Sequence, residues 1–332
     1  MQMQYHVKER QRVQRSICNM NDKILLQILT KMKKYCVHTC FDKQFSELTT
    51  LGCGGKIKIT VYPDTVHKLV KVIRLLDKLG VERYVLGKGS NVLATDSEYD
   101  GVVIVTTKLS RISVHGVRVY ALAGTSTQKV YKELERRGLT GGEFLTCLPS
   151  TIGGATVSNA GCYGQDIKSV LHSVTVLYKG KILKLSADEC RLTKRNSLFK
   201  EDADYTLLAV RLKFTRSTPK EVKQKSQQMR DAKWNTQPLN YRSAGCMLYH
   251  DNISISRLTD QAGLKGYTIG GAKVSDKHAG FILNVDKATS KDIYLVMQHV
   301  ERTLWERFGV IAKREICLVN FTKEDYDFFA KC

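Results

Sequence analysis

Two hydrophobic repeats alternate along this chain, one with the period of an α-helix and one with the period of a β-strand. Helical spacing of apolar residues predicts three amphipathic helices. The first carries Ile24, Leu25, Ile28, Leu29 and Met32, the second Val66, Leu69, Val70, Ile73 and Leu76, and the third Ile293, Val296, Met297, Val300, Leu304 and Phe308.

Capping residues set the ends of these helices. Asp64 is the expected N-cap of a helix reaching Leu79, which Gly80 ends, and Thr289 or Ser290 caps the last long helix before Gly309. The same signals predict helices over 127–137, closed by Gly138, and over 255–262. The basic segment 216–233 is expected to be a helix that joins two domains, and Ser186 to Glu189 fits a capping box.

Short apolar or alternating runs between these helices predict strands. They cover 57–61, 84–86, 101–106, 205–214, 281–284, 310–311 and 316–319, with hairpins over 112–123 and 173–185. Mixed strands and helices of this kind predict an α+β fold. Strand 57–61, helix 64–79 and strand 84–86 resemble a βαβ unit.

In residues 143–166 the apolar positions follow neither the helical nor the strand period. This stretch, EFLTCLPSTIGGATVSNAGCYGQD, holds five glycines or prolines and many small side chains. Small residues let the backbone approach a flat or phosphorylated group closely, and they equally suit a packed crossover inside the core. The composition leaves both interpretations open.

A second glycine-rich turn, Gly87 to Asn91, follows the strand 84–86. Successive backbone N–H groups in such a turn can hold a diphosphate. The turn is neither GxxxxGK[ST] nor GxGxxG, so it has neither common nucleotide fingerprint.

Charge and composition narrow the class of protein. The 332 residues carry a formal net charge of +21, with 42% hydrophobic and 26% charged residues, as in globular proteins. Residues 1–45 hold nine Lys or Arg against three acids, and residues 216–233 hold six against two. Aromatic residues are not interleaved with these runs, so we expect no nucleic acid partner. No apolar run suits a bilayer span and the N-terminus has no secretory pattern, so we expect a cytoplasmic protein without membrane insertion.

The ten cysteines form no CxxC pair and no disulfide framework, so they are expected to be reduced. Cys36, His38 and Cys40 could form part of a metal site but lack a second ligand pair, and we expect no metal.

Seven motifs, in order, resemble one family. They are LTTLGCGGK, YVLGKGSNVL, EFLTCLPSTIGGATVSNAGCYGQDI, CRLTKRNSLFK, YRSAGCMLY, GLKGYTIGGAKVSDKHAGFILN and FGVIAKREICLV, spread from about Leu48 to Val319. This order resembles UDP-N-acetylenolpyruvoylglucosamine reductase, the MurB family of peptidoglycan precursor synthesis in cell wall biogenesis. The resemblance implies two FAD-binding subdomains of the vanillyl-alcohol-oxidase type and a C-terminal substrate domain. With it we expect a basic helical extension over 1–45, subdomains over 46–107 and 108–218, and a substrate domain over 219–322.

The resemblance also implies the chemistry. FAD is the cofactor, NADPH the reductant, and the enolpyruvyl ether of UDP-N-acetylglucosamine the substrate, and we expect a monomer. Hydride passes from flavin N5 to the enolpyruvyl group. Arg195 matches the arginine facing the substrate carboxylate, Glu315 the glutamate that stabilises the enolic intermediate, and Cys246 the position of the serine that protonates it.

Binding residues are likewise implied by the resemblance. The cofactor contacts expected are Gly87, Lys88, Gly89, Ser90, Asn91, Gly124, Thr125, Leu148, Pro149, Ser150, Gly153, Gly154, Asn159 and Gly161. The substrate contacts expected are Tyr163, Lys233, Tyr249, His250 and His278.

Three departures from the family pattern bear on substrate recognition. Cys246 replaces a serine, and a thiol releases its proton more readily than an alcohol does. Tyr249 and His250 stand where the family commonly has lysine and asparagine, and Ser150 stands where a glycine is usual. These changes leave two alternatives: a flavoprotein on this scaffold with another substrate, or a basic nucleic-acid- or membrane-binding protein with a vestigial flavin site.

Overall fold

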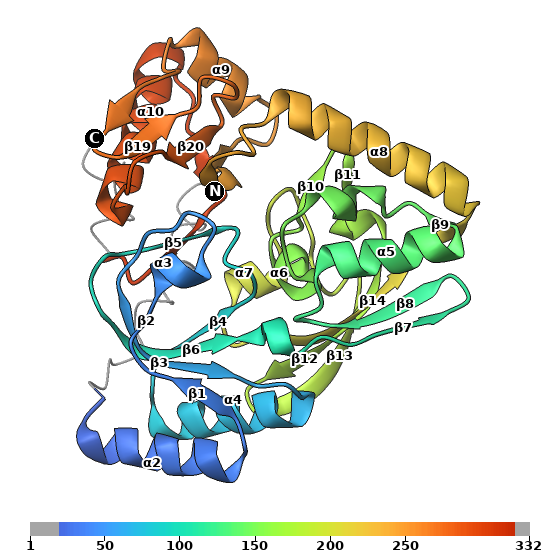
Figure 1. The fold of residues 1–332 in the computed structure, drawn as a ribbon, viewed down its shortest axis with the longest axis vertical. Coiled ribbons are helices and arrows are strands. Elements are labelled where there is room, and N and C mark those ends of the chain that lie inside the picture. The colour runs from blue at the N-terminus through green and yellow to red at the C-terminus, as the bar shows by residue number, and fades with distance from the viewer. Residues whose placement is uncertain (1–19, 323–332) are drawn as a thin grey trace. The chain divides into compact units, whose positions relative to one another are not determined.

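The computed structural model describes residues 20–322 (Figure 1). Contacts divide the chain into two compact units, each assembled from three separated segments. The first unit takes the described residues up to Phe41, then Ile59–Lys88 and Asp100–Asp231. The second takes Asp42–Lys58, Gly89–Tyr99 and the described residues from Ala232 onward. The boundaries expected at 45, 107 and 218 stay a prediction.

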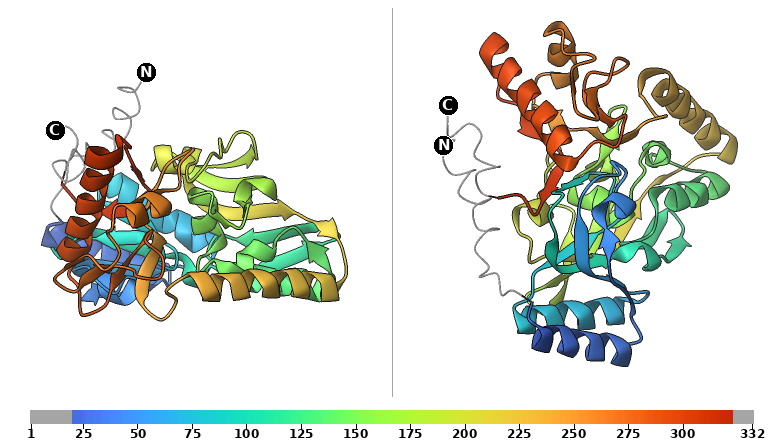
Figure 2. Two further views of the ribbon diagram at one scale, coloured as in Figure 1. Left: turned by 90° about the horizontal axis from the view of Figure 1, so that it is seen from above. Right: turned by 60° about the vertical axis from the view of Figure 1, so that its left-hand side comes forward.

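The first sheet has the order β1-β3-β6-β4, with β2 pairing β3. These strands are β1 (His38–Cys40), β2 (Lys43–Gln44), β3 (Lys56–Tyr62), β4 (Arg83–Leu86) and β6 (Tyr99–Val105). Strands β4 and β6 are parallel, and β6 lies between β3 and β4, so the two strands of the expected βαβ unit share this sheet without being adjacent. Helix α4 (Val66–Leu79) buries Leu69, Val70, Val72, Ile73 and Leu76, and α2 (Asp22–Lys34) packs on α4 (Figure 2).

Two details of the N-terminal region differ from the sequence prediction. Helix α4 is capped by Thr65, whose hydroxyl accepts the N–H of Lys68 at 3.2 Å, so Asp64 is not the N-cap. Asp64 instead forms an ion pair with the Lys68 ammonium at 2.9 Å. Residues 38–40, inside the predicted helical extension, form β1, and residues 1–19 of that extension lie outside the described residues.

The second sheet of the first unit is antiparallel, in the order β13-β12-β14-β8-β7. Its strands are β7 (Ile112–His115), β8 (Arg118–Leu122), β12 (Leu171–Tyr178), β13 (Lys181–Ser186) and β14 (Thr206–Lys213). Helices α5 (Thr127–Arg137), α6 (Ile152–Val157) and α7 (Leu198–Glu201) share its core, which includes Val130, Leu134, Ile152, Ala155 and Phe199.

Short elements complete the first unit. They are the 3₁₀ turns η1 (Thr106–Lys108), η2 (Glu143–Cys147) and η3 (Ile167–Ser169), the hairpin β10 (Gly161–Cys162) with β11 (Gln165–Asp166), and the pair β9 (Leu139–Thr140) with β15 (Thr215–Arg216). The capping-box bonds between Ser186 and Glu189 form, but a turn follows them instead of a helix. Helix α8 (Pro219–Thr236) confirms the helix expected after residue 216.

The second unit is built on the sheet β16-β20-β19-β18. These strands are β16 (Arg242–Cys246), β18 (Thr268–Ile269), β19 (Ala272–Val274) and β20 (Phe281–Asn284). Helix α10 (Ser290–Phe308) covers one face, burying Ile293, Val296, Met297, Val300 and Leu304 with Ala272, Val274 and Ile282. Thr289 caps α10 and Gly309, at φ 64°, ends it, as the sequence predicts.

Further short elements of the second unit surround this sheet. They are α3 (Phe45–Leu48), α9 (Ile255–Gln261), β17 (Leu248–Tyr249) paired with β21 (Lys313–Arg314), and β22 (Cys317–Val319) parallel to β5 (Val92–Ala94). The strand expected at 310–311 does not form. The N–H of Val310 bonds back to the Leu304 carbonyl and closes α10, so pairing begins only at Lys313.

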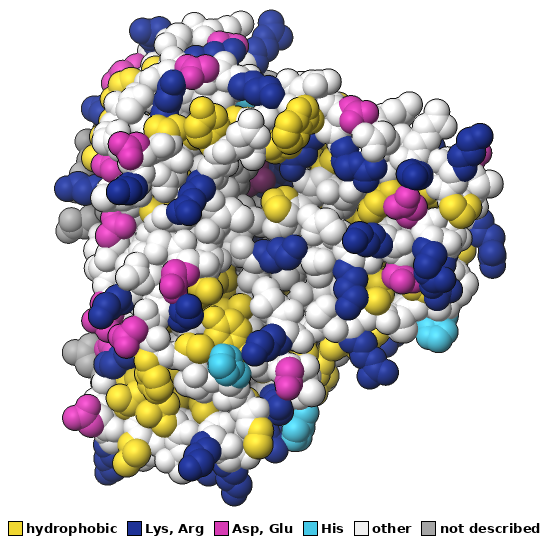
Figure 3. Space-filling view, in the orientation of Figure 1, with side chains coloured by type: hydrophobic (Ala, Val, Ile, Leu, Met, Phe, Trp, Pro, Cys, Tyr) yellow, Lys and Arg dark blue, Asp and Glu magenta, His cyan; other side chains and the backbone are white. Residues whose placement is uncertain are grey.

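Further features of the described residues concern membrane spans, cysteines, metal ligands and surface charge. Every helix within residues 20–322 is too short or too polar to span a bilayer. No disulfide joins any two of the eight cysteines described, and burial raises the pKa of Cys53 to about 12 and that of Cys190 to about 11. No three potential metal ligands cluster in this part of the chain. Lysine and arginine side chains spread over the visible face, with acidic groups between them (Figure 3).

Candidate active site

Two helices of the first unit begin side by side. Ser126 caps α5 and Thr151 caps α6, and these two residues form a β-bridge. The N–H of Ile152 donates to the Thr125 carbonyl at 2.7 Å, and that of Thr127 donates to the Ser150 carbonyl at 3.1 Å. The loops 124–127 and 148–152 are therefore fixed against one another.

Glycines permit this close approach. A Cβ on Gly124 would lie 1.7 Å from the Thr106 carbonyl oxygen, and one on Gly153 would lie 2.8 Å from the Ala123 Cβ. A Cβ on Gly87 would lie 2.5 Å from the Thr151 hydroxyl, which brings the start of the Gly87–Asn91 turn to the same place. Three chain segments thus meet here because three residues lack side chains.

Gly154 behaves differently from its neighbours. It is exposed, whereas Thr151, Ile152, Gly153 and Ala155 are buried. A Cβ there would meet only the hydroxyls of Ser150 and Thr151, at 3.2 and 3.3 Å. The backbone of α6 is therefore bare at one point, where a flat group can lie against it.

Polar side chains frame this cluster of loops. Exposed Lys88 donates to the Gln128 side chain at 3.2 Å, and Gln128 donates in turn to the Leu148 carbonyl at 2.5 Å. Thr125 is buried and its hydroxyl donates to the Arg111 carbonyl at 3.0 Å, while Pro149 is exposed. The positive end of α5 and the Lys88 ammonium both favour an anion nearby.

The remaining residues of the 87–91 turn belong to the second unit. Gly89 has φ 62° and its carbonyl accepts the Thr50 N–H at 3.1 Å, while Ser90 is half-buried. The Asn91 side chain donates to the Glu315 carbonyl at 3.1 Å, and its own carbonyl accepts the Cys317 N–H at 3.1 Å. Asn91 thus anchors the C-terminal segment.

Asn159 is buried, and its side chain forms hydrogen bonds with other residues of the protein. Its amide donates to Asp166 and to the Thr193 carbonyl, each at 2.9 Å, and its oxygen accepts the Lys168 N–H at 2.9 Å. These bonds hold the loop that leads into the β10–β11 hairpin.

Arg195 lies against this hairpin. Its guanidinium donates to the Gly161 carbonyl at 3.0 Å. Tyr163, at the turn of the same hairpin with φ 54°, is exposed. Arg195 itself has φ 57°, an uncommon conformation for a residue with a side chain. The structure thus brings Arg195 and the hairpin of Tyr163 together in the first unit.

Cys246 ends β16 in the second unit, beside Gly280 and His278. A Cβ on Gly280 would lie 3.1 Å from the Cys246 sulfur and 3.1 Å from the His278 ring. The thiol and the imidazole can be no more than about 6 Å apart, since each lies this close to one point. Both side chains are half-buried.

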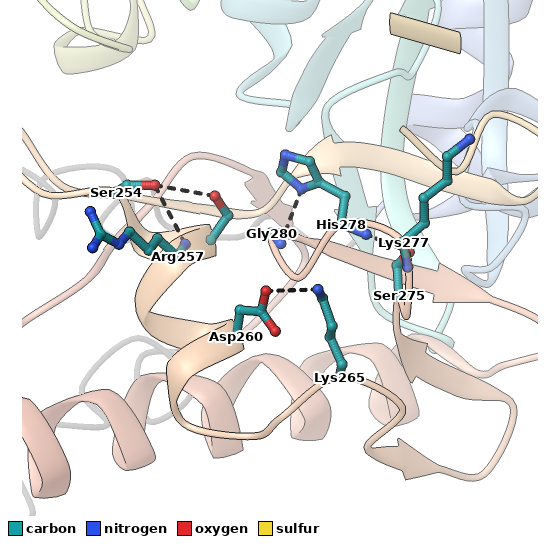
Figure 4. Close-up of polar contacts among 9 residues, drawn as sticks. Ser254, Arg257, Asp260, Lys265, Ser275, Lys277, His278 and Gly280 are labelled. Atoms are coloured by element: carbon teal, nitrogen blue, oxygen red, sulfur yellow. Dashed lines mark hydrogen bonds and ion pairs between the residues drawn. The ribbon is translucent and has the colours of Figure 1, made fainter. Parts of the chain in front are cut away.

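The surroundings of His278 define its protonation (Figure 4). Its Nδ1 accepts the Gly280 N–H at 3.2 Å, so the neutral ring carries its proton on Nε2. Burial lowers the pKa of His278, and the positive charge of Lys265 adds to the effect. Lys265 itself pairs with Asp260 at 2.7 Å, and Lys277 extends away from the ring.

Glu315 lies next to Cys246 through one backbone bond. The N–H of Glu315 donates to the carbonyl of Met247, which directly follows Cys246, at 2.8 Å. The Met247 N–H donates in turn to the Gly280 carbonyl at 3.2 Å. Cys246, His278 and Glu315 therefore converge on Met247 and Gly280 in the second unit.

The two residues that depart from the family pattern lie on β17 and just after it. Tyr249 pairs with Lys313 in the β17–β21 ladder, and the Lys313 ammonium lies 5.9 Å from the Tyr249 ring centre. Lys313 also bonds to Asp251, and the His250 Nδ1 accepts the Asn252 N–H at 3.2 Å. A lysine ammonium is thus present beside Tyr249, supplied by a different strand.

A pocket of about 290 Å³ lies within the second unit. Trp234, Tyr241, Lys273, Lys277 and Leu283 are among the residues that line it. Leu283 pairs with Ser243, and Phe281, two residues earlier on β20, pairs with Cys246. Since alternate residues of a strand share a face, the pocket and Cys246 lie on one face of the sheet. Lys233 is half-buried and directly precedes Trp234 on α8.

Three residues of this arrangement were absent from the sequence prediction. Gln128 has no motif that marks it. Gly280 lies two residues after His278, and its only signal in the sequence is that a glycine leaves room for neighbouring side chains. Arg314 precedes Glu315, and it forms a buried ion pair with Glu301.

Comparisons with known proteins agree with this geometry. Residues 57–186 match an FAD-binding domain family, and residues 237–319 match the C-terminal domain of UDP-N-acetylenolpyruvoylglucosamine reductase. The reductase of Caldicellulosiruptor saccharolyticus is 33% identical over 86% of this chain and 93% of its own. That of Clostridium novyi is 34% identical over 83% of this chain and 91% of its own.

A solved structure gives the same result. The crystal structure of UDP-N-acetylenolpyruvylglucosamine reductase from Thermus caldophilus has a TM-score of 0.73 and 27% identity. It covers 85% of this chain, which in turn covers 98% of it. This chain therefore belongs to the UDP-N-acetylenolpyruvoylglucosamine reductase family, with an FAD-binding domain followed by the family's C-terminal domain.

Proposed function

We propose that this chain is an FAD-dependent oxidoreductase that uses NADPH to reduce UDP-N-acetylglucosamine enolpyruvate to UDP-N-acetylmuramate in peptidoglycan precursor synthesis. Family membership supports this reaction. The observation that supports the residue-level proposal is the backbone bond from the Glu315 N–H to the carbonyl of Met247, the residue after Cys246, which agrees with a proton donor and a carboxyl group that act on one substrate.

The residues present fit FAD. Gly87, Gly124 and Gly153 let three segments meet, Gly154 leaves bare backbone for a flat ring, and Lys88 with the start of α5 suits a diphosphate. Leu148, Pro149, Ser150 and Thr125 complete this wall, while Asn159 and Gly161 support it from within. When bound, FAD supplies the hydride acceptor for NADPH and the hydride donor for the substrate.

Arg195 is proposed to bind the substrate carboxylate. A guanidinium has fixed charge and a planar pair of donors that matches a carboxylate. Its bond to the Gly161 carbonyl orients it at the hairpin of Tyr163, which would contact the same part of the substrate. Negative charge that develops toward the carboxyl group during reduction is thereby stabilised.

Cys246 is proposed to deliver the proton that completes the reduction. This role requires the thiol, not the thiolate, to be present at the start. A neutral His278 suits it, because an imidazolium beside the sulfur would favour the thiolate. His278, with its proton on Nε2, can also donate a hydrogen bond to the substrate.

Glu315 is proposed to stabilise the enolic intermediate. Its backbone is fixed at two points, by Met247 and by Asn91. A protonated carboxyl group held in this way donates a hydrogen bond to an enolate oxygen without reorganising during the reaction.

The pocket of the second unit is proposed to take the nucleotide part of the substrate. It combines the aromatic rings of Trp234 and Tyr241 with the ammonium groups of Lys273 and Lys277, which suits a base and a diphosphate. Lys233 directly precedes Trp234 in the chain, and it is proposed as a further substrate contact together with Tyr249, His250 and Lys313.

A two-step flavin assay tests this function. The purified protein is expected to be yellow, to bleach with NADPH, and to regain its absorbance when the enolpyruvyl nucleotide is added. Bleaching without return on the enolpyruvyl nucleotide would instead favour an altered substrate. Protein that stays colourless after reconstitution with FAD would refute both flavoenzyme functions.

A further inference from the structure

Arg314, the residue before Glu315, forms the most buried ion pair near the proposed site. Its Nε donates to Glu301 Oε1 at 2.7 Å and its Nη2 donates to Oε2 at 2.8 Å. The side chains are 16% and 2% exposed. Burial works against the guanidinium charge, and the bonds to Glu301 outweigh it, so that the pKa of Arg314 is raised.

Helix α10 contacts the Arg314 guanidinium through two of its residues. Glu301 lies on the buried face of α10, and the Arg314 guanidinium also stacks 5.3 Å from the ring centre of Tyr294 on the same helix. The Tyr294 hydroxyl accepts from Gln298 at 2.8 Å. A 19-residue helix with a capping box and a glycine stop is a rigid support.

The strand that carries Arg314 has little support of its own. Strand β21 has two residues and pairs only with the two residues of β17. Arg314 pairs there with Leu248, and Glu315 then bonds to Met247. The pair with Glu301 therefore ties a very short strand, and the carboxyl group that follows it, to the main helix of the unit.

Stability alone does not account for an ion pair at this place. Two buried charges lose their hydration, and replacing such a pair by apolar residues is often neutral for stability. A bidentate pair, in contrast, fixes distance and direction at once.

We propose that Arg314, held by Glu301, is a positioning residue that sets the Glu315 carboxyl group relative to Cys246 for the substrate half of the reaction. This inference rests on the proposed function. The inference can be tested apart from that function, because it concerns only the half-reaction in which the substrate reoxidises the flavin.

The test compares wild type with the double substitution Glu301→Leu and Arg314→Met, which removes both charges together. The thermal midpoint and the rate of flavin bleaching by NADPH are expected to stay close to wild type. The rate at which the enolpyruvyl nucleotide restores flavin absorbance should fall about 10- to 100-fold, since a displacement of about 1 Å is enough for such a loss. The loss should appear in kcat and not in KM.

The single substitution Arg314→Lys gives a second measurement that does not depend on the double variant folding. It keeps the charge but loses the bidentate geometry, so its rate of flavin return should lie between those of wild type and the double variant. If Arg314→Lys returns flavin absorbance at the wild-type rate, the inference is wrong.

A matched control lies in the first unit. Arg83 pairs with Asp77 at 2.9 Å, and its side chain is 6% exposed. The substitutions Asp77→Leu and Arg83→Met should leave both half-reactions unchanged. Equal slowing of both half-reactions in the Glu301 and Arg314 double variant would show a general structural role and overturn the inference. Absence of flavin return in wild type would instead refute the proposed function.

Discussion

The backbone N–H of Glu315 donates to the carbonyl oxygen of Met247, 2.8 Å away, and Met247 directly follows Cys246. Cys246 and Glu315, 69 positions apart in the chain, are thus brought near one another in the second unit by a backbone hydrogen bond. Substitutions of the Cys246 or Glu315 side chain should therefore change chemistry while this backbone arrangement persists.

The bare backbone at Gly154 predicts a difference between two adjacent glycines. Gly154→Ala should keep the fold, because its Cβ meets only two hydroxyls, but it should weaken FAD binding if the flavin lies there. Gly153→Ala should lose stability as well, by about 1–3 kcal/mol, since its Cβ would overlap Ala123. Flavin content and thermal midpoint, measured together on both variants, check this. Full flavin retention in Gly154→Ala would contradict the placement of the ring.

The protonation of His278 predicts a pH dependence of stability. Burial lowers the pKa of His278 below its ordinary value, so the unfolded chain binds the proton more readily. The stability that neutral His278 contributes is present above about pH 6.5, its pKa in the unfolded chain, and is lost as the pH falls below that value. His278→Gln should therefore lose less stability than wild type between about pH 7 and 5.

Thermal midpoints of both proteins across this pH range provide the measurement. The groups around the ring are Cys246, Ser256 and Lys265, which pairs with Asp260, and all are retained in the variant. Parallel curves for the two proteins would mean that His278 titrates no differently in the folded and unfolded chains.

The pocket of the second unit predicts an effect on substrate affinity alone. Trp234 is 60% exposed, and its carbonyl accepts the Lys277 ammonium at 2.7 Å. Trp234→Ala should raise KM for the enolpyruvyl nucleotide about 10-fold, with little change in stability, because an exposed ring that stacks on a base contributes about 1–3 kcal/mol. Exposed Trp305, on α10, provides the control substitution Trp305→Ala. An unchanged KM for Trp234→Ala would place the nucleotide elsewhere.

Periodic apolar residues and terminal glycines made the helices predictable. The stops at Gly80, Gly138 and Gly309 are confirmed, as are the buried faces of α4 and α10, except that Phe308 at the end of α10 is exposed. Thr65 and Asp64 both suit the N-cap position. In the structure the Lys68 N–H bonds to the Thr65 hydroxyl, whereas the Lys68 ammonium pairs with Asp64. Helix α6 was not predictable, because two glycines disfavour a helix and contacts with Ala123 and Thr125 decide the outcome.

The candidate site was predictable only where a motif marks a residue. Arg195, Cys246 and Glu315 come from the family resemblance, and their roles stay predictions. The ion pair between Arg314 and Glu301 joins strand β21 to helix α10, and no local sequence pattern identifies a partner that lies in another element. Its detection required the folded structure.

Cys246 provides the most direct test of the proposed mechanism. In Cys246→Ala, flavin bleaching by NADPH should proceed at the wild-type rate. The return of flavin absorbance on adding the enolpyruvyl nucleotide should be at least about 100-fold slower, the lower end of the range for loss of a positioned proton donor. Stopped-flow absorbance of the two half-reactions separates these steps. Equal slowing of both steps, or an unchanged return of absorbance, would contradict Cys246 as the proton donor.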